Sequence, residues 1–175
     1  MELNELVKIR RSVRAYSEER VKEEDLKEMI SCAQMAPSWK NSETGRYYVA
    51  LSDEAIEKIY ESLPDFNKRS SKNAAYIVTT FKKGLSGYVS EGNPSPEGDL
   101  WGSYDLGLQN SYMLLKASEL GYDTLIMGLR DSDAIREYFA IPEDEIIMAV
   151  IAIGKRAAEP KFNPRKNLED ILKIK

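Results

Sequence analysis

Residues 100–120 read LWGSYDLGLQNSYMLLKASEL, a segment without proline and without β-branched residues. Apolar side chains such as Leu108, Tyr112 and Leu115 recur at helical spacing and occupy more than one face of the resulting helix. Gly121 follows at the position where a helix commonly ends in a left-handed turn. The pattern therefore predicts a long, central and largely buried helix.

Short apolar segments on both sides of this helix predict the strands of one sheet. β-branched and aromatic residues dominate 47–51 and 76–81 before the helix and 124–127 after it. Residues 146–153 are almost wholly apolar, as expected of a buried strand. The segment 12–16 is also predicted to be extended.

Further helices are predicted from apolar residues at 3.6-residue spacing, at 3–10, 23–36, 53–63, 131–139 and 168–172. Pro37 and Pro64 are expected to end the second and third of these. Residues 82–99 contain four glycines and two prolines and are predicted to form a long loop, a candidate lid.

The order of these elements is not the regular strand–helix alternation of a dinucleotide-binding fold. The chain also lacks the G-x-G-x-x-G and G-x-x-x-x-G-K-[ST] phosphate-binding motifs. We therefore predict an α+β fold, built as one domain over residues 1–175.

Composition narrows the classes of function. The net charge is −4 and the pI is about 5.1, which argues against a nucleic-acid-binding surface. No stretch is apolar for long enough to span a bilayer, so we expect no membrane partner. Cys32 is the only cysteine, which excludes an intrachain disulfide and favours the cytoplasm. Histidine is absent, so Ser/His/Asp and Cys/His catalytic sites are excluded, and a cofactor is expected to supply any chemistry.

Positive charge gathers near the two ends of the chain. If residues 10–14, RRSVR, are extended, Arg10, Ser12 and Arg14 share one side, and guanidinium groups pair well with phosphate. The alternative is a solvated basic turn. A second basic group comprises Lys155, Arg156, Lys161, Arg165 and Lys166, so the two groups are candidates to converge on one small anion.

The segment RRSVR after a short first helix resembles the N-terminal signature of FMN-dependent nitroreductases. Several later segments match further landmarks of that family: APSWKNSE at 36–43, DLGLQN at 105–110, GYDT at 121–124 and Gly154 followed by basic residues and proline. Residues 43–45 and Asn163 depart from the family pattern, which has Gln-Pro-Trp and a lysine there. Together the matching segments cover nearly the whole chain.

The resemblance implies a nitroreductase-like fold: a central mixed sheet flanked by helices, in an intertwined homodimer. It implies that FMN is bound tightly where the two subunits meet and that NADH or NADPH binds transiently as the reductant. Electrons would pass to a small planar acceptor of the nitroaromatic, quinone or enone type by a ping-pong mechanism. The alternative within the same fold is a flavin-binding or ligand-sensing protein without turnover.

The resemblance also assigns roles to individual residues, with no side chain acting as a catalytic acid or base. The phosphate group of FMN would be bound by the cluster Arg10, Arg11 and Ser12 together with Arg165, and Arg14 would lie at the pyrimidine edge of the ring. Pro37, Ser38 and Trp39 would reach the ring from the partner subunit, and Asn41 would help to hydrogen-bond the ring. The segment Met127, Gly128 and Leu129 would run beside the ring and offer a backbone N–H to its N5 atom.

Other interpretations of individual residues remain open. Trp39 is as well suited to covering a subunit interface as to stacking on the flavin. Asp105 and Asn110 are expected to have structural roles within the long helix.

Overall fold

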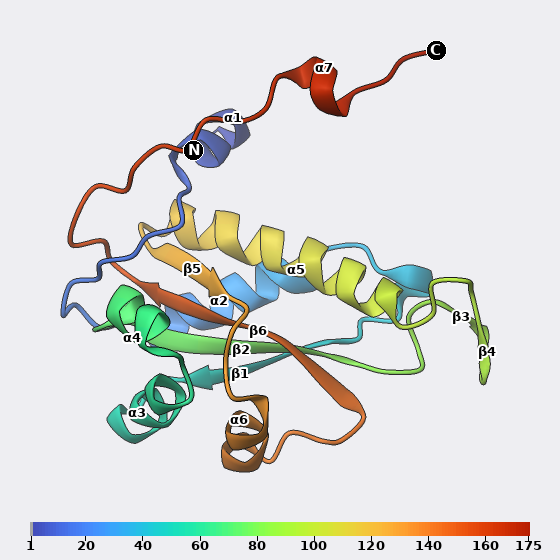
Figure 1. Cartoon of the computed structure of the whole chain (residues 1–175), viewed down its shortest axis with the longest axis horizontal. Coiled ribbons are helices and arrows are strands. Elements are labelled where there is room, and N and C mark those ends of the chain that lie inside the picture. Colours follow the sequence, from blue (N-terminus) through green and yellow to red (C-terminus); the bar gives the residue numbers. More distant parts are fainter. Residues whose placement is uncertain (1) are drawn as a thin grey trace.

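The computed structural model describes residues 2–175 and contains a four-stranded sheet (Figure 1). The strands are β1 (Gly45–Ala50), β2 (Ala75–Lys82), β5 (Asp123–Met127) and β6 (Glu145–Gly154), in the order β1-β2-β6-β5. All three pairings within this sheet are antiparallel. The four predicted strands are therefore confirmed, with ends that shift by one or two residues.

Helices cover both faces of the sheet (Figure 1). The helices α2 (Glu23–Gln34) and α5 (Leu100–Glu119) pack on one face, and α3 (Asp53–Glu61) and α6 (Ser132–Phe139) pack on the other. Side chains alternate along each central strand, so Ile77 joins the core under α2 and α5 while Val78 joins the core under α3. The long helix is confirmed, and Gly121 follows it with a φ of +80°, as a left-handed cap requires.

Two elements escape the sequence prediction. Helix α4 (Asp65–Ser71) begins directly after Pro64, which the prediction used only as a helix terminator. Its seven residues carry little apolar periodicity, and a proline next to the first turn costs no intrahelical hydrogen bond. The predicted loop 82–99 contains a short hairpin, β3 (Tyr88–Ser90) and β4 (Asn93–Pro94).

The N-terminal segment extends the sheet beyond β5. After α1 (Leu3–Ile9), the N–H of Val13 donates to the carbonyl of Thr124 over 3.1 Å, and Ser12 forms a parallel bridge with the same residue. This bridge is parallel, whereas the pairings within the four-stranded sheet are antiparallel, so strand pairing of both kinds occurs, as in the predicted mixed sheet. The predicted extended conformation of 12–16 is thus found at the edge where the basic residues lie.

The C-terminal tail leaves the body after β6 and ends in the short helix α7 (Leu168–Ile171). Figure 1 shows the tail passing α1, so that the two ends of the chain lie on the same side of the molecule. None of the helices among residues 2–175 has the length and apolar character needed to cross a membrane.

Candidate functional site

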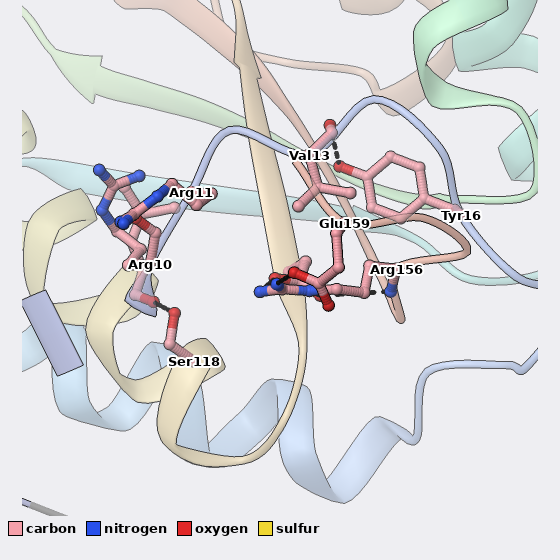
Figure 2. A network of polar contacts seen from close by, with 9 residues as sticks. Arg10, Arg11, Val13, Tyr16, Ser118, Arg156 and Glu159 are labelled. Carbon is pink, nitrogen blue, oxygen red and sulfur yellow. Dashed lines mark hydrogen bonds and ion pairs between the residues drawn. The ribbon is translucent and has the colours of Figure 1, made fainter. Parts of the chain in front are cut away.

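The basic residues of the N-terminal segment lie where α1 ends. Arg10 is the C-cap residue of α1, and its N–H donates to the carbonyl of Leu6 over 3.0 Å. One Nη of Arg11 donates to the backbone carbonyl of Arg10 over 2.8 Å, so the Arg11 side chain folds back along the segment (Figure 2). Ser12 and Arg14 follow on the exposed edge, where the Arg14 guanidinium donates to the carbonyl of Ser12 over 3.3 Å.

Arginines from the two ends of the chain meet here. Burial lowers the pKa of Arg10, and the positive charges of Arg165 and then Arg11 lower it further. Among residues 2–175, none of Arg10, Arg11, Arg14 and Arg165 forms an ion pair with a carboxylate. Like charges held together without a counter-ion are the arrangement expected of an anion-binding site.

Two members of the second basic group, Arg156 and Lys155, already have carboxylate partners. Arg156 pairs with the buried carboxylate of Asp123 through two bonds, Nε to Oδ2 at 2.9 Å and Nη2 to Oδ1 at 2.5 Å, and also with Glu159 (Figure 2). Lys155 pairs with Glu19 at 2.8 Å. Nearby carboxylates neutralise the charges of both residues, so the predicted convergence of the two basic groups on one anion stays a prediction that rests on Arg165.

Met127 is the last residue of β5, and Gly128 and Leu129 form the turn that follows it. Met127 is buried, whereas Gly128 and Leu129 are exposed, and a Cβ built on Gly128 would meet no atom within 4 Å. The N–H of Gly128 has no acceptor among the described residues. Arg130 holds the turn by donating to the carbonyls of Gly128 and Ile147. The turn thus presents a free donor with open space around it.

Two residues that support this turn were not found from the sequence. Burial lowers the pKa of Arg130. One of its Nη atoms donates to the carbonyl of Gly128 in the turn, and the other donates to the carbonyl of Ile147 in β6. Asn67 is buried in the first turn of helix α4, which was not predicted from the sequence, and its Nδ2 donates to the carbonyl of Leu129 over 3.0 Å. Arg130 directly follows the predicted segment 127–129 in the sequence, and this position was the one feature that could have pointed to it. No such feature pointed to Asn67.

An apolar surface lies next to the turn. Ile126 and Met148 come from the adjacent strands β5 and β6, yet they are 51% and 37% exposed. The Ser103 hydroxyl lies 4.0 Å from the Met148 sulfur, so Met148 faces α5. The sheet therefore keeps uncovered apolar area beside the free N–H of Gly128.

The segment 37–43 is held against the N-terminal part of α5. The N–H of Trp39 donates to Asp105 over 2.9 Å, and its indole Nε1 donates to the carbonyl of Tyr88 over 3.1 Å. The indole also packs on Trp101, with 4.9 Å between ring centroids. Within one chain, these contacts favour a covering role for Trp39, and the buried Asp105 has the structural role that was expected.

Residues 39–41 form a 3-10 turn, η1 (Trp39–Asn41), with unusual backbone angles. Lys40, Asn41 and Glu43 all have positive φ, between 46° and 54°. The Nδ2 of Asn41 donates to the Glu43 carboxylate over 2.8 Å, and the Ser38 hydroxyl accepts from the N–H of Glu43 over 3.1 Å. Pro37 and Asn41 remain exposed. Such strained conformations persist where surrounding contacts hold them, and they cluster at functional sites.

A single chain does not bring all predicted residues together. Asp105 holds segment 37–43 near the start of α5, whereas Ile9, next to the arginines, borders the same cavity as Ser118 near its end. Thirteen residues of helix separate the two positions, or about 20 Å. The predicted residues thus fall into three groups: the arginines with Ser12 at one end of α5, Pro37, Ser38, Trp39 and Asn41 at the other, and Met127, Gly128 and Leu129 at the end of β5.

Comparisons with known proteins agree with this architecture. The chain is 26% identical over 170 residues, covering 91% of its length and 92% of the relative, to an Archaeoglobus fulgidus protein for which NADH dehydrogenase or NAD(P)H nitroreductase activity is proposed. A solved structure from Staphylococcus epidermidis, described as a proposed NAD(P)H:FMN oxidoreductase, superimposes with a TM-score of 0.85 at 25% identity over 99% of this chain and 95% of that one. An oxidoreductase containing FMN superimposes with a TM-score of 0.77 at 26% identity, over 90% and 79% of the two chains.

These structural similarities confirm the predicted fold. The model of the nitroreductase family matches residues 7–155, which extend from the first helix to the end of the last strand of the sheet. The chain belongs to the nitroreductase family.

Proposed function

We propose that this protein is an FMN-dependent oxidoreductase that receives electrons from NADH or NADPH and delivers them to a small planar acceptor. One observation carries the proposal: the tail that bears Arg165 lies against the N-terminal arginines, with the guanidinium carbon of Arg11 5.0 Å from the centre of the Phe162 ring. The like charges of Arg10, Arg11 and Arg165 repel one another, and none of the three forms an ion pair with a carboxylate among residues 2–175. A phosphate monoester carries about −1.5 to −2 charges near neutral pH and would relieve this repulsion. The donor set therefore fits the phosphate end of FMN.

In this proposal, the phosphate group is held by Arg10 and Arg165, and the exposed hydroxyl of Ser12 adds a neutral donor. Arg11 already donates to the carbonyl of Arg10, so its main contribution is to hold that arginine in place. Arg14 stands further along the exposed edge, within reach of the pyrimidine end of the ring. Positive charge there stabilises the negative charge that a flavin gains on reduction.

The ring end of FMN fits the turn after β5. The free N–H of Gly128 supplies a donor, and the exposed apolar surface of Ile126 and Met148 supplies area for a planar ring to cover. Arg130 and Asn67 bind the carbonyls of Gly128 and Leu129, which directly follow this N–H along the chain, so the donor is held before the ring arrives. A preformed donor costs little reorganisation when charge develops nearby.

A second copy of the chain is proposed to complete the site. Pro37, Ser38, Trp39 and Asn41 lie about 20 Å along α5 from the arginines of their own chain. In this proposal a partner subunit brings its copy of this segment to the ring. Apolar side chains stay exposed on α1 and α5, namely Leu3, Val7, Leu100, Tyr104 and Tyr112. Exposed apolar surface of this extent is typical of an interface, which supports a homodimer.

Bound FMN would supply the chemistry, by accepting a hydride from the nicotinamide and returning electrons to an acceptor that binds after the oxidised nicotinamide leaves, hence by a ping-pong mechanism. The task of the protein is to position planar partners and to exclude water. Nitroaromatics, quinones and enones are the proposed acceptors. The lone Cys32 requires no oxidising compartment, which is consistent with a cytoplasmic location.

The colour of the purified protein tests cofactor binding. We expect a yellow dimer whose visible flavin absorbance is lost when NADH or NADPH is added without oxygen and returns when a quinone or nitroaromatic is added. Absorbance that is lost on reduction but is not restored by any of the acceptors tested would indicate a flavin-binding protein without this turnover. A protein that stays colourless after incubation with excess FMN would refute the proposal.

The Arg10→Ala variant tests the phosphate site. Loss of one charge-assisted hydrogen bond should cost about 1.5–3 kcal/mol and weaken FMN binding about 10- to 100-fold. Arg20→Ala is the matched control, because Arg20 forms an exposed pair with Asp53 and does not belong to the cluster. Equal FMN affinity in the two variants would contradict the assigned role of Arg10.

A further inference from the structure

The C-terminal tail has few attachments to the body of the protein. The last backbone hydrogen bond from the tail to the body joins the N–H of Ala157 to the carbonyl of Ala15 over 2.9 Å. Glu159 adds an ion pair with Arg156 at 3.0 Å, and every residue from Lys161 to the end of the chain is exposed. Arg165 lies six residues beyond Glu159, so these attachments alone do not explain its approach to Arg10.

A further contact lies between these attachments and Arg165. The guanidinium carbon of Arg11 stands 5.0 Å from the centre of the Phe162 ring, within the range of a cation–π interaction. The same guanidinium donates to the carbonyl of Arg10, so its position is fixed relative to the arginine cluster. Phe162 remains 64% exposed, and no aromatic partner packs against it among the described residues. Arg11 is thus its identified specific contact.

The link from Phe162 to Arg165 is short and stiff. Three residues span at most about 11 Å when fully extended. Pro164 fixes its own φ and keeps the preceding Asn163 in an extended conformation. The Arg165 side chain bends back to donate to the carbonyl of Asn163 over 3.4 Å. Anchoring Phe162 therefore restricts where the Arg165 guanidinium can lie.

We propose that Phe162, held against Arg11, is a positioning residue that places Arg165 beside Arg10 to bind the phosphate group of FMN. This inference rests on the proposed function. Arg11 then serves the site through the tail, by holding an aromatic ring. Arg10 and Arg165 are brought together against their mutual repulsion, and the cation–π contact contributes to offsetting that cost.

The test compares FMN affinities of variants in the full-length protein, by fluorescence or absorbance titration. Phe162→Ala should weaken FMN binding about 3- to 10-fold, less than the loss in Arg165→Ala, because it loosens the second arginine without removing it. Phe162→Tyr should restore binding, since it keeps the aromatic ring. Leu168→Ala is the matched control, because it removes another exposed apolar side chain of the tail. The exposure of Phe162 leaves the fold intact in its variant, which equal melting temperatures would verify.

The double variant separates positioning from a general effect of the tail. If Phe162 acts through Arg165, then Phe162→Ala should cause no further loss in an Arg165→Ala background. The inference would be overturned if the fold-losses of FMN affinity in the two single variants multiplied in the double variant, or if Phe162→Ala kept wild-type affinity. Either result would leave FMN binding itself established. A wild-type protein that binds no FMN would overturn the proposed function and the inference together.

Trypsin gives a second readout that does not depend on turnover. Cleavage after Lys161 and Lys166 should slow when FMN is added to the wild-type protein, because the phosphate draws Arg165 and its neighbours onto the body. The protection should be lost in Phe162→Ala and kept in Leu168→Ala. Equal protection of both variants would count against the positioning role.

Discussion

Replacing Gly102 by alanine tests how closely the central helix approaches the sheet. A Cβ at this position would lie 2.3 Å from Cδ2 and 2.5 Å from Cε2 of Phe81, whereas carbon atoms prefer separations of about 3.5–4.0 Å. The helix or the ring must therefore move by more than about 1 Å. Phe81 is only 1% exposed, so its ring has no free space to enter. Overpacking of this kind costs about 1–3 kcal/mol, and the higher helix propensity of alanine returns at most about 1 kcal/mol.

A second glycine of the same helix supplies the control. A Cβ on Gly107 would meet no atom within 4 Å, so Gly107→Ala should gain up to about 1 kcal/mol from helix propensity alone. The free energies of unfolding, measured by urea titration with circular dichroism, should place Gly102→Ala about 1–3 kcal/mol below Gly107→Ala. Because α5 carries both Asp105 and the surface facing Met148, a shifted helix should also weaken FMN binding. Equal free energies of unfolding in the two variants would refute the packing argument.

Two further predictions concern stability. Asp123→Asn should lower the free energy of unfolding by about 1–3 kcal/mol in a urea titration, because it leaves the half-buried Arg156 without its bidentate carboxylate. The control Asp53→Asn, at an exposed ion pair, should change the free energy of unfolding by less than about 1 kcal/mol. Burial raises the pKa of Tyr76 from 10.0 to about 12. Its neutral phenol therefore stabilises the fold below pH 10, and about 3 kcal/mol should be lost between pH 10 and 12. Urea titrations across this range should show a smaller loss in Tyr76→Phe, and an unchanged pH profile in that variant would contradict the prediction.

The elements of the sheet and the long helix were predictable because their signals are local. An unbroken apolar segment predicts a strand such as β6, and apolar residues at helical spacing that end at Gly121 predict α5. The family was also visible from the sequence, because the segments RRSVR and APSWKNSE keep their order and distance along the chain. Helix α4 and the β3–β4 hairpin were missed, since short polar elements are stabilised by tertiary contacts rather than by their own periodicity.

The partners of charged and polar side chains were decided by the tertiary structure alone. The sequence grouped Arg156 with Arg165 as basic residues near one end, but folding gives Arg156 the buried carboxylate of Asp123 and leaves Arg165 without a carboxylate partner among residues 2–175. Asn67 likewise supports the turn at Leu129 from 62 residues away in the sequence. Residue type and local spacing determine which elements form, whereas the pairing of distant charges depends on how those elements pack, because electrostatic and hydrogen-bonding partners are selected by distance in space.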